Sequence, residues 1–166
     1  MSKIKIKNSK QKIADILLKI GCVNVNFKNK YTLTSGKKSP VYVDCRKLIS
    51  FPKEREIVIN EMTKLIKSKY KKKVIVAGGE TAGIPYSSFI SHKLKMPMVY
   101  IRKQPKGFGK GKLIEGEYKK KSTSILIEDM STDGGSKLHF INSLRKNTLS
   151  VKDIYVVFFY NIYPVA

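Results

Sequence analysis

The sequence has few cysteines and no long apolar runs. Cys22 and Cys45 stand alone, without the spacing of a metal site, so we expect free thiols in a reducing compartment. No apolar run approaches the length that crosses a bilayer. Residues 1–10 are charged throughout and no apolar segment follows them, which argues against a signal peptide. These absences predict a soluble, cytoplasmic protein without a membrane partner.

Acidic residues and arginine are also scarce. The chain has 34 lysine and arginine residues against 12 acids, which gives a formal net charge of +22. The arginines are Arg46, Arg55, Arg102 and Arg145, and the lysines are spread along the whole chain. A nucleic-acid binder can carry such a charge. The even spread favours a solvated lysine coat over a nucleic-acid footprint, although the charge alone leaves that partner open.

The 166 residues are enough for one hydrophobic core and short for two, so we expect a single domain. A first helix is predicted from a Ser9 cap to about Ile20, and a second from 52 to 69. Segment 31–44 predicts two short strands around a turn. The apolar face of the second helix is formed by Val58, Met62, Leu65 and Ile66.

The rest of the chain alternates between apolar strands and helices. Helical spacing occurs at 84–95 and 135–146. Because the strands are continuously apolar and are separated by helices, they predict a parallel sheet covered on both faces. Ligands of such sheets bind beyond the carboxyl ends of the strands. The predicted strands are 74–77, 98–102, 124–128 and 154–160.

The segment Glu-Asp-Met-Ser-Thr-Asp-Gly-Gly-Ser at 128–136 has the features of a phosphate-binding loop. Its glycines let backbone N–H groups approach a phosphate, and the next helix presents its positive end. Two adjacent carboxylates can accept hydrogen bonds from vicinal ribose hydroxyls, although a lone acidic pair is more often a structural cap. The loop is neither a Walker A motif nor a Rossmann fingerprint. We predict that it binds a 5-phosphoribosyl group.

Three further segments contain glycines, hydroxyls and cations. They read Leu-Thr-Ser-Gly-Lys-Lys-Ser-Pro at 33–40, Gly-Gly-Glu-Thr-Ala-Gly-Ile-Pro at 78–85 and Tyr-Ile-Arg-Lys-Gln-Pro-Lys-Gly at 100–107. The loop at 128–136 resembles the phosphoribosyl-pyrophosphate (PRPP) motif of type I phosphoribosyltransferases. The four segments in this order resemble the orotate phosphoribosyltransferase family, over nearly the whole chain.

The resemblance implies an α/β protein with the type I phosphoribosyltransferase fold, in which helices flank a central, mostly parallel sheet. A small N-terminal hood with the first helix would occupy about 1–50, and the sheet core about 52–166. Family members make orotidine 5′-monophosphate and pyrophosphate from orotate and PRPP, in pyrimidine biosynthesis. The resemblance also implies Mg²⁺ carried mainly by the substrate, with no direct metal ligand in the protein. It further implies a homodimer.

The resemblance assigns roles to particular residues. Arg102, Lys106 and Asp129 would be catalytic, and Lys103 would join Arg102 and Lys106 in contacting the pyrophosphate. Ser35, Gly36 and Thr132 would contact orotate. Glu128 and Asp129 would hold the ribose hydroxyls. The phosphate would be held by Ser131, Thr132, Asp133, Gly134, Gly135 and Ser136.

The sequence departs from the family pattern at several places. Phe108 occupies a loop position where many members have histidine. Asp133 puts a carboxylate into the phosphate loop, which is unfavourable unless that carboxylate points away or accepts a backbone N–H. After the last predicted strand many members have an Asp-Arg pair and continue further, so the chain resembles a member that is short at the C-terminus. Two alternatives stay open, namely a phosphoribosyltransferase for another base and a non-catalytic PRPP- or RNA-binding protein.

Overall fold

The computed structural model describes residues 2–33, 36–105 and 112–162, with side chains from residue 9 onward. The chain forms two compact units, Met1–Glu61 and Met62–Ala166. Helix α2 (Pro52–Lys69) contains the boundary between them. None of the helices in the described part of the chain combines the length and apolar character that a membrane crossing requires.

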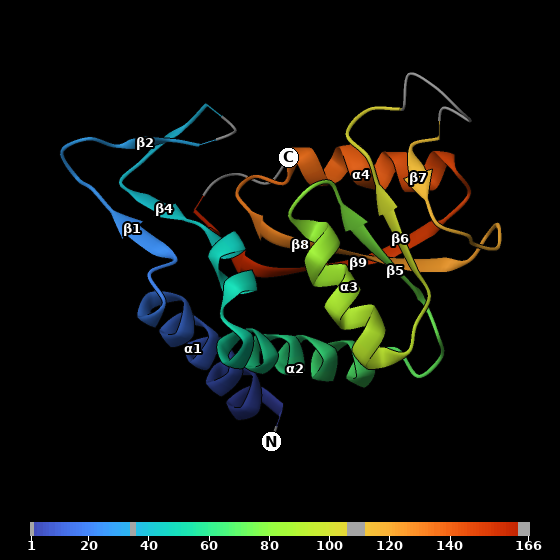
Figure 1. Ribbon diagram of the computed structural model, residues 1–166, viewed down its shortest axis with the longest axis horizontal. Coiled ribbons are helices and arrows are strands. Elements are labelled where there is room, and N and C mark those ends of the chain that lie inside the picture. Colours follow the sequence, from blue (N-terminus) through green and yellow to red (C-terminus); the bar gives the residue numbers. More distant parts are fainter. Residues whose placement is uncertain (1, 34–35, 106–111, 163–166) are drawn as a thin grey trace. The chain divides into compact units, whose positions relative to one another are not determined.

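The first unit contains one long helix, two small antiparallel sheets, a 3₁₀-helix and the first part of α2 (Figure 1). Strand β1 pairs with β4, and β2 pairs with β3. The elements are α1 (Ser2–Lys19), β1 (Val23–Val25), β2 (Tyr31–Thr32), β3 (Lys38–Ser39), β4 (Val41–Val43) and the 3₁₀-helix η1 (Cys45–Ser50).

The predicted start of the first helix was wrong. Helix α1 begins at Ser2, because no glycine or proline interrupts the chain before Ser9. The Ser9 hydroxyl instead donates a hydrogen bond to Oε2 of Glu61, at 2.7 Å. The predicted stop was right, since Gly21 has a φ of +69°, a conformation that favours glycine.

Both strands predicted within 31–44 are present, as β2 and β4, but they do not pair with each other. Tyr31 pairs with Ser39 within the expected turn, while Val41 pairs with Val25 of β1. Pro40 separates the two pairings, because proline has no N–H to continue a ladder. Strand β1 itself was not predicted, since three residues are too few to show a period.

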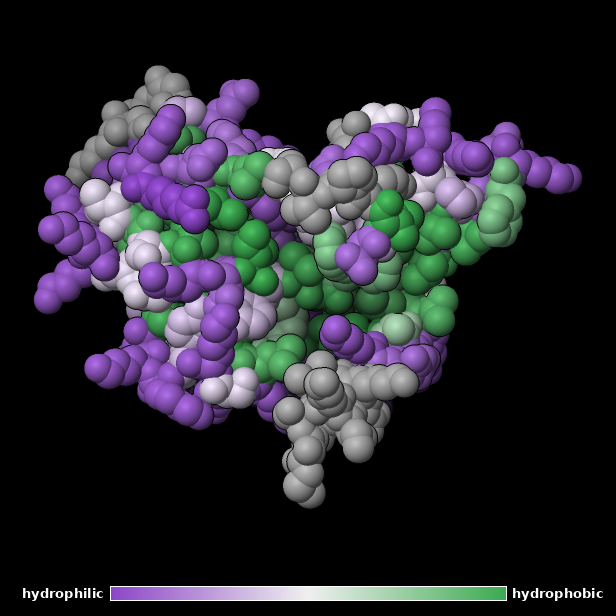
Figure 2. Space-filling model, turned by 180° about the vertical axis from the view of Figure 1, so that it is seen from behind, coloured by the Kyte–Doolittle hydropathy of each residue, from purple (hydrophilic) through white to green (hydrophobic). Residues whose placement is uncertain are grey.

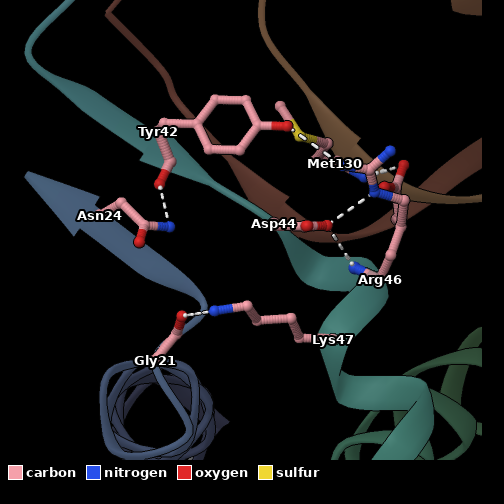
Figure 3. A network of polar contacts seen from close by, with 8 residues as sticks. Gly21, Asn24, Tyr42, Asp44, Arg46, Lys47 and Met130 are labelled. Carbon is pink, nitrogen blue, oxygen red and sulfur yellow. Dashed lines mark hydrogen bonds and ion pairs between the residues drawn. The ribbon is translucent and has the colours of Figure 1, made fainter. Parts of the chain in front are cut away.

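A polar network fixes the start of η1 (Figure 3). Oδ1 of Asp44 accepts hydrogen bonds from the Arg46 backbone N–H at 3.2 Å and from Nε at 2.6 Å. The hydrogen bond from the Arg46 side chain holds the pKa of Asp44 below its usual range. Nη2 of Arg46 also donates to the Tyr42 hydroxyl at 3.1 Å, which ties η1 to β4.

The first unit also encloses both cysteines as free thiols. Cys22 and Cys45 are 0% exposed. Burial, followed by the nearby Asp44 carboxylate, raises the pKa of the Cys22 thiol. The prediction of free thiols is confirmed.

Helix α2 has the bounds that the sequence predicts. Val58, Met62 and Ile66 are buried, but Leu65 is 41% exposed, so its place on the buried face was wrong. Leu65 and Ile66 are consecutive and therefore point in different directions from the helix axis, which places Leu65 at the margin of the apolar stripe.

Figure 2 shows hydrophilic side chains projecting over much of the visible face, with hydrophobic surface exposed between them.

The second unit is built on a five-stranded sheet in the order β7-β6-β5-β8-β9. All neighbouring strands are parallel except β7, which runs antiparallel to β6. The mostly parallel sheet is therefore confirmed, and the short β7 is an addition that the sequence did not reveal. The elements are β5 (Ile75–Gly79), α3 (Gly83–Leu94), β6 (Met98–Ile101), β7 (Ile114–Glu115), β8 (Thr123–Ser131), α4 (Gly135–Lys146) and β9 (Ser150–Phe159).

Helices α3 and α4 cover opposite faces of this sheet (Figure 1). Ile75 and Ala77 of β5 belong to one buried cluster with Phe140 of α4. Gly78 points to the other face, where a Cβ atom would lie 2.2 Å from Oγ of Ser87 in α3. Because side chains alternate along a strand, the two helices enclose β5 from both sides.

Candidate active site

Three segments with ligand-binding chemistry follow three adjacent strands. Residues 80–82 follow β5, residues 102–105 follow β6, and residues 132–134 follow β8. The three strands are parallel neighbours in the order β6-β5-β8. Their carboxyl ends therefore meet at one edge of the sheet, where ligands of open α/β sheets bind. The fold brings together three of the four segments that the sequence singled out.

Strand β8 is longer than predicted and includes the acidic pair. Its pairing with β9 joins Glu128 to Val156 and continues as far as Ser131. The Tyr160 N–H also donates to the Ser131 carbonyl oxygen at 3.0 Å. These bonds keep the chain extended, so the loop itself is only 132–134. Gly134 has a φ of +90° and stands directly before α4.

The Asp133 carboxylate is turned toward donors of its own loop. Its Oδ1 accepts hydrogen bonds from the Gly135 N–H at 3.1 Å and from Oγ1 of Thr132 at 3.3 Å. Asp133 therefore accepts a backbone N–H, the condition under which its carboxylate is tolerated in the loop, and it caps the start of α4. Two donors that the sequence assigned to a phosphate are already engaged by this side chain.

Glu128 is a buried acid beside a buried lysine. Its side chain is largely enclosed, with the residue 5% exposed, and Nζ of Lys137 lies 3.3 Å from its Oε2. Nζ of Lys137 also donates to Oγ of Ser136 at 3.1 Å. Burial raises the pKa of Glu128 to about 7, against the opposing effect of the Lys137 ammonium. Oε1 of Glu128 has no hydrogen-bond partner in the part of the chain that the structure describes.

Gly79 and Gly83 provide the space that Glu128 occupies. A Cβ atom at Gly79 would lie 2.1 Å from Oε1 of Glu128, and one at Gly83 would lie 2.4 Å from it. Both distances are shorter than any stable contact, so a side chain at either position would force Glu128 to move. At Gly83 the added atom would also lie 2.6 Å from the Ile127 carbonyl oxygen, which belongs to the backbone. Sequence analysis did not reveal that this turn packs against the acid.

The predicted cations follow β6. The Arg102 backbone N–H donates to the Leu113 carbonyl oxygen at 2.8 Å, and Nε of its side chain donates to the Gln104 carbonyl oxygen at 3.3 Å. The Lys103 N–H donates to Oε2 of Glu80 at 2.7 Å, which links this segment to the turn after β5. Lys106 and Phe108 lie outside the described residues, so the role of Lys106 stays a prediction.

The predicted orotate residues come from two places. Ser35 lies outside the described residues. Gly36 has a φ of +79° in the turn that links β2 to β3, and its N–H donates to the Leu33 carbonyl oxygen at 2.8 Å. Thr132 is buried in the loop after β8. Their contacts with a base stay predictions.

Lys137 is the site residue that sequence analysis missed. It stands one residue after the predicted phosphate loop and is 9% exposed, which is rare for a lysine without an anionic partner. The available signal was a cation in the first turn of α4, directly after a segment that begins with two acids. Pairing it with Glu128 required knowledge of how α4 lies on the sheet.

The sheet, its helices on both faces and the acidic pair before a glycine loop match the type I phosphoribosyltransferase fold. Solved structures support this fold. The orotate phosphoribosyltransferase from Aeropyrum pernix gives a TM-score of 0.72 at 24% identity, over 89% of this chain and 93% of that one. The adenine phosphoribosyltransferase from Saccharomyces cerevisiae gives 0.69 at 16% identity, over 92% and 98%.

Sequence comparison specifies the family, although no family model matches the chain. A relative from Ruegeria sp. (strain TM1040), named orotate phosphoribosyltransferase, is 44% identical over 153 residues, which cover 91% of this chain and 68% of the relative. A relative of the same name from Roseobacter denitrificans is 41% identical with the same coverage. The chain belongs to the orotate phosphoribosyltransferase family.

Proposed function

We propose that this chain transfers the 5-phosphoribosyl group from PRPP to orotate, producing orotidine 5′-monophosphate and pyrophosphate in pyrimidine biosynthesis. The observation that carries the proposal is the 44% identity to a relative named for this activity, over 91% of the chain. The position of the acidic pair and the glycine loop, at the ligand edge of the sheet, supports the same chemistry.

The 5-phosphoribosyl group would bind around the end of β8. The start of α4 presents backbone N–H groups and the positive end of the helix to the 5′-phosphate. Ser131 and Ser136 add hydroxyl groups beside that loop. Asp129 and Glu128 would accept hydrogen bonds from the ribose hydroxyls. Oε1 of Glu128, which lacks a donor among the described residues, supports this assignment.

Loss of pyrophosphate leaves positive charge on the ribose and gathers negative charge on the leaving group. The negative charge on the departing pyrophosphate would be stabilised by the cations Arg102, Lys103 and Lys106. Asp129 would stabilise the positive ribose. Bound Mg²⁺ would neutralise part of the pyrophosphate charge.

The residues present fit a substrate-held Mg²⁺. The described residues contain no group of three or more His, Cys, Asp or Glu side chains that could enclose a metal. Mg²⁺ commonly keeps several waters and binds through substrate phosphates rather than in a dedicated protein cage. Glu128 and Asp129 would then remain available for the ribose hydroxyls. The homodimer and the cytoplasmic location remain part of the proposal.

The decisive experiment follows the ultraviolet absorbance of orotate in the presence of PRPP and Mg²⁺. Wild-type protein is expected to consume orotate, whereas Lys106→Ala and Asp129→Asn should each reduce kcat about a hundredfold or more. Glu117→Gln, which removes one negative charge from an exposed position after β7, is the matched control and should retain activity.

Each negative result has a distinct meaning. PRPP binding without orotate consumption, with adenine consumed instead, would replace orotate by a purine acceptor. PRPP binding without any base consumption would support a non-catalytic role. Equal activity of Asp129→Asn and wild type would remove Asp129 from the catalytic residues.

A further inference from the structure

A groove lies at the amino ends of the parallel strands. The pairs Ile75 with Ser124 and Thr123 with Ser150 place the starts of β5, β8 and β9 side by side. A groove of about 770 Å³ is lined by residues that lead into these strands. The candidate active site follows the carboxyl ends of the strands, so the two features lie at opposite edges of the same sheet.

Lysines from segments distant in the sequence line this groove. Lys69, Lys71, Lys72 and Lys73 come from the end of α2 and the turn after it, and Lys152 comes from β9. Ser122 also lines the groove, directly after three further lysines at 119–121. The sequence favours an evenly spread coat, but the fold gathers these lysines around one concave surface.

Asp153, the acidic residue that lines the groove, already accepts two hydrogen bonds. Oδ1 of Asp153 accepts a hydrogen bond from Nζ of Lys69 at 2.6 Å, and Oδ2 accepts one from the Tyr70 hydroxyl. These two hydrogen bonds hold the pKa of Asp153 below its usual range, so it stays ionised beside its partners. No carboxylate in the described part of the chain pairs with the four remaining lysines, Lys71, Lys72, Lys73 and Lys152.

The groove also has apolar walls. Val74, Ile75 and Pro97 line it together with Tyr70, whose ring is held by the hydrogen bond to Asp153. Lysines bind phosphate as mobile point charges and do not read bases, while aromatic side chains stack bases of any sequence. A flat lipid surface could contact the lysines but could not enter the concave part. A flexible polyanion with apolar faces fits both features.

We propose that this groove binds single-stranded RNA without sequence preference. The backbone phosphates would lie against Lys71, Lys72, Lys73 and Lys152. A base would stack on the Tyr70 ring, and another would pack against the exposed Pro97. The binding surface is separate from the phosphate loop, so the proposal does not depend on the transferase reaction.

Fluorescence anisotropy with a labelled RNA of about 12 nucleotides, within the known range of single-strand site sizes, tests this proposal. The groove variant carries Lys71→Glu, Lys72→Glu and Lys73→Glu. The matched control carries Lys10→Glu, Lys12→Glu and Lys28→Glu, three exposed lysines of the first unit. Both variants have the same net charge. Circular dichroism should first show that both are folded like the wild type.

Wild-type protein is expected to bind the RNA, and the groove variant should bind it at least about tenfold more weakly. The slope of the logarithm of the binding constant against the logarithm of the salt concentration should fall in magnitude by about two. The control should stay within about threefold of wild type, because its charge is removed outside the groove. Equal loss in both variants would overturn the proposal in favour of general charge attraction. Displacement of the RNA by PRPP, stronger binding to phosphatidylserine vesicles, or no binding by wild type would also overturn it.

Discussion

Nζ of Lys137 lies 3.3 Å from Oε2 of Glu128, and this ion pair joins the first turn of α4 to strand β8. Both residues are buried, so neither charge is well solvated. Lys137 also holds Ser136, a predicted phosphate ligand. The ion pair therefore couples the protonation state of Glu128 to the geometry of the phosphate loop.

The buried carboxyl of Glu128 should make stability depend on pH. Its pKa is about 7 in the folded protein against an ordinary value of 4.5, so the folded state binds the proton more tightly. This contribution is complete below pH 4.5 and is lost as the pH rises through about 7. Relative to Glu128→Gln, which does not titrate, the wild type should lose about 3 kcal/mol of stability across that window. Urea denaturation at several pH values measures the difference, and a constant difference would contradict the raised pKa.

Replacing Lys137 by methionine should leave Glu128 buried without its cation. We expect Lys137→Met to cost about 3 kcal/mol of unfolding free energy near pH 8, and clearly less near pH 5, where Glu128 is protonated. Adding Glu128→Gln should restore much of the loss, because no charge remains to be paired. Lys146→Met, at an exposed position in the same helix, is the control. A loss of the same size at both pH values would show that the lysine acts only through packing.

The glycines around Glu128 should not tolerate a methyl group. A Cβ atom at Gly83 would lie 2.6 Å from the Ile127 carbonyl oxygen, which belongs to the backbone of a central strand. Gly83→Ala should therefore destabilise the protein by about 1–3 kcal/mol in thermal or urea unfolding. Gly135→Ala is the matched control, since its nearest neighbouring atom would be 3.7 Å away. Similar stability of the two variants would mean that the close approach to the Ile127 carbonyl oxygen is relieved without cost.

Two variants of Asp133 should affect loop stability and phosphate affinity differently. Asp133→Ala removes the acceptor of the Gly135 N–H and should cost about 1 kcal/mol of stability. Asp133→Asn keeps an acceptor but removes the charge, so its stability should match the wild type while PRPP binds about fivefold more tightly. Urea denaturation and titration calorimetry measure the two effects. Weaker PRPP binding by Asp133→Asn would show that the carboxylate itself assists the ligand.

Long elements with local signals were predicted well. Pro52 favours the first position of a helix and apolar spacing continues to Ile66, so the bounds of α2 were right. Helix α4 was likewise placed correctly after its glycines. The pairing of β1 with β4 was missed because strands of three residues show no periodicity, and partner choice depends on the rest of the fold.

The site was predictable where its chemistry is contiguous. The acids, hydroxyls and glycines of 128–136 follow one another in the sequence, so their place at the end of a strand could be inferred. The direction of Asp133 and the pairing of Glu128 with Lys137 depend on side-chain geometry. The contact between Gly79 and Glu128 joins neighbouring strands, and no local pattern reports it.

The enclosed thiols give the first unit a built-in reporter. Because Cys22 and Cys45 are 0% exposed, a thiol reagent can reach them only when that unit opens. The rate of labelling in native buffer therefore measures the frequency of this opening, separately from the unfolding of the sheet. A new cysteine placed on the surface would react much faster, so a dye could be attached there with little labelling of the native thiols.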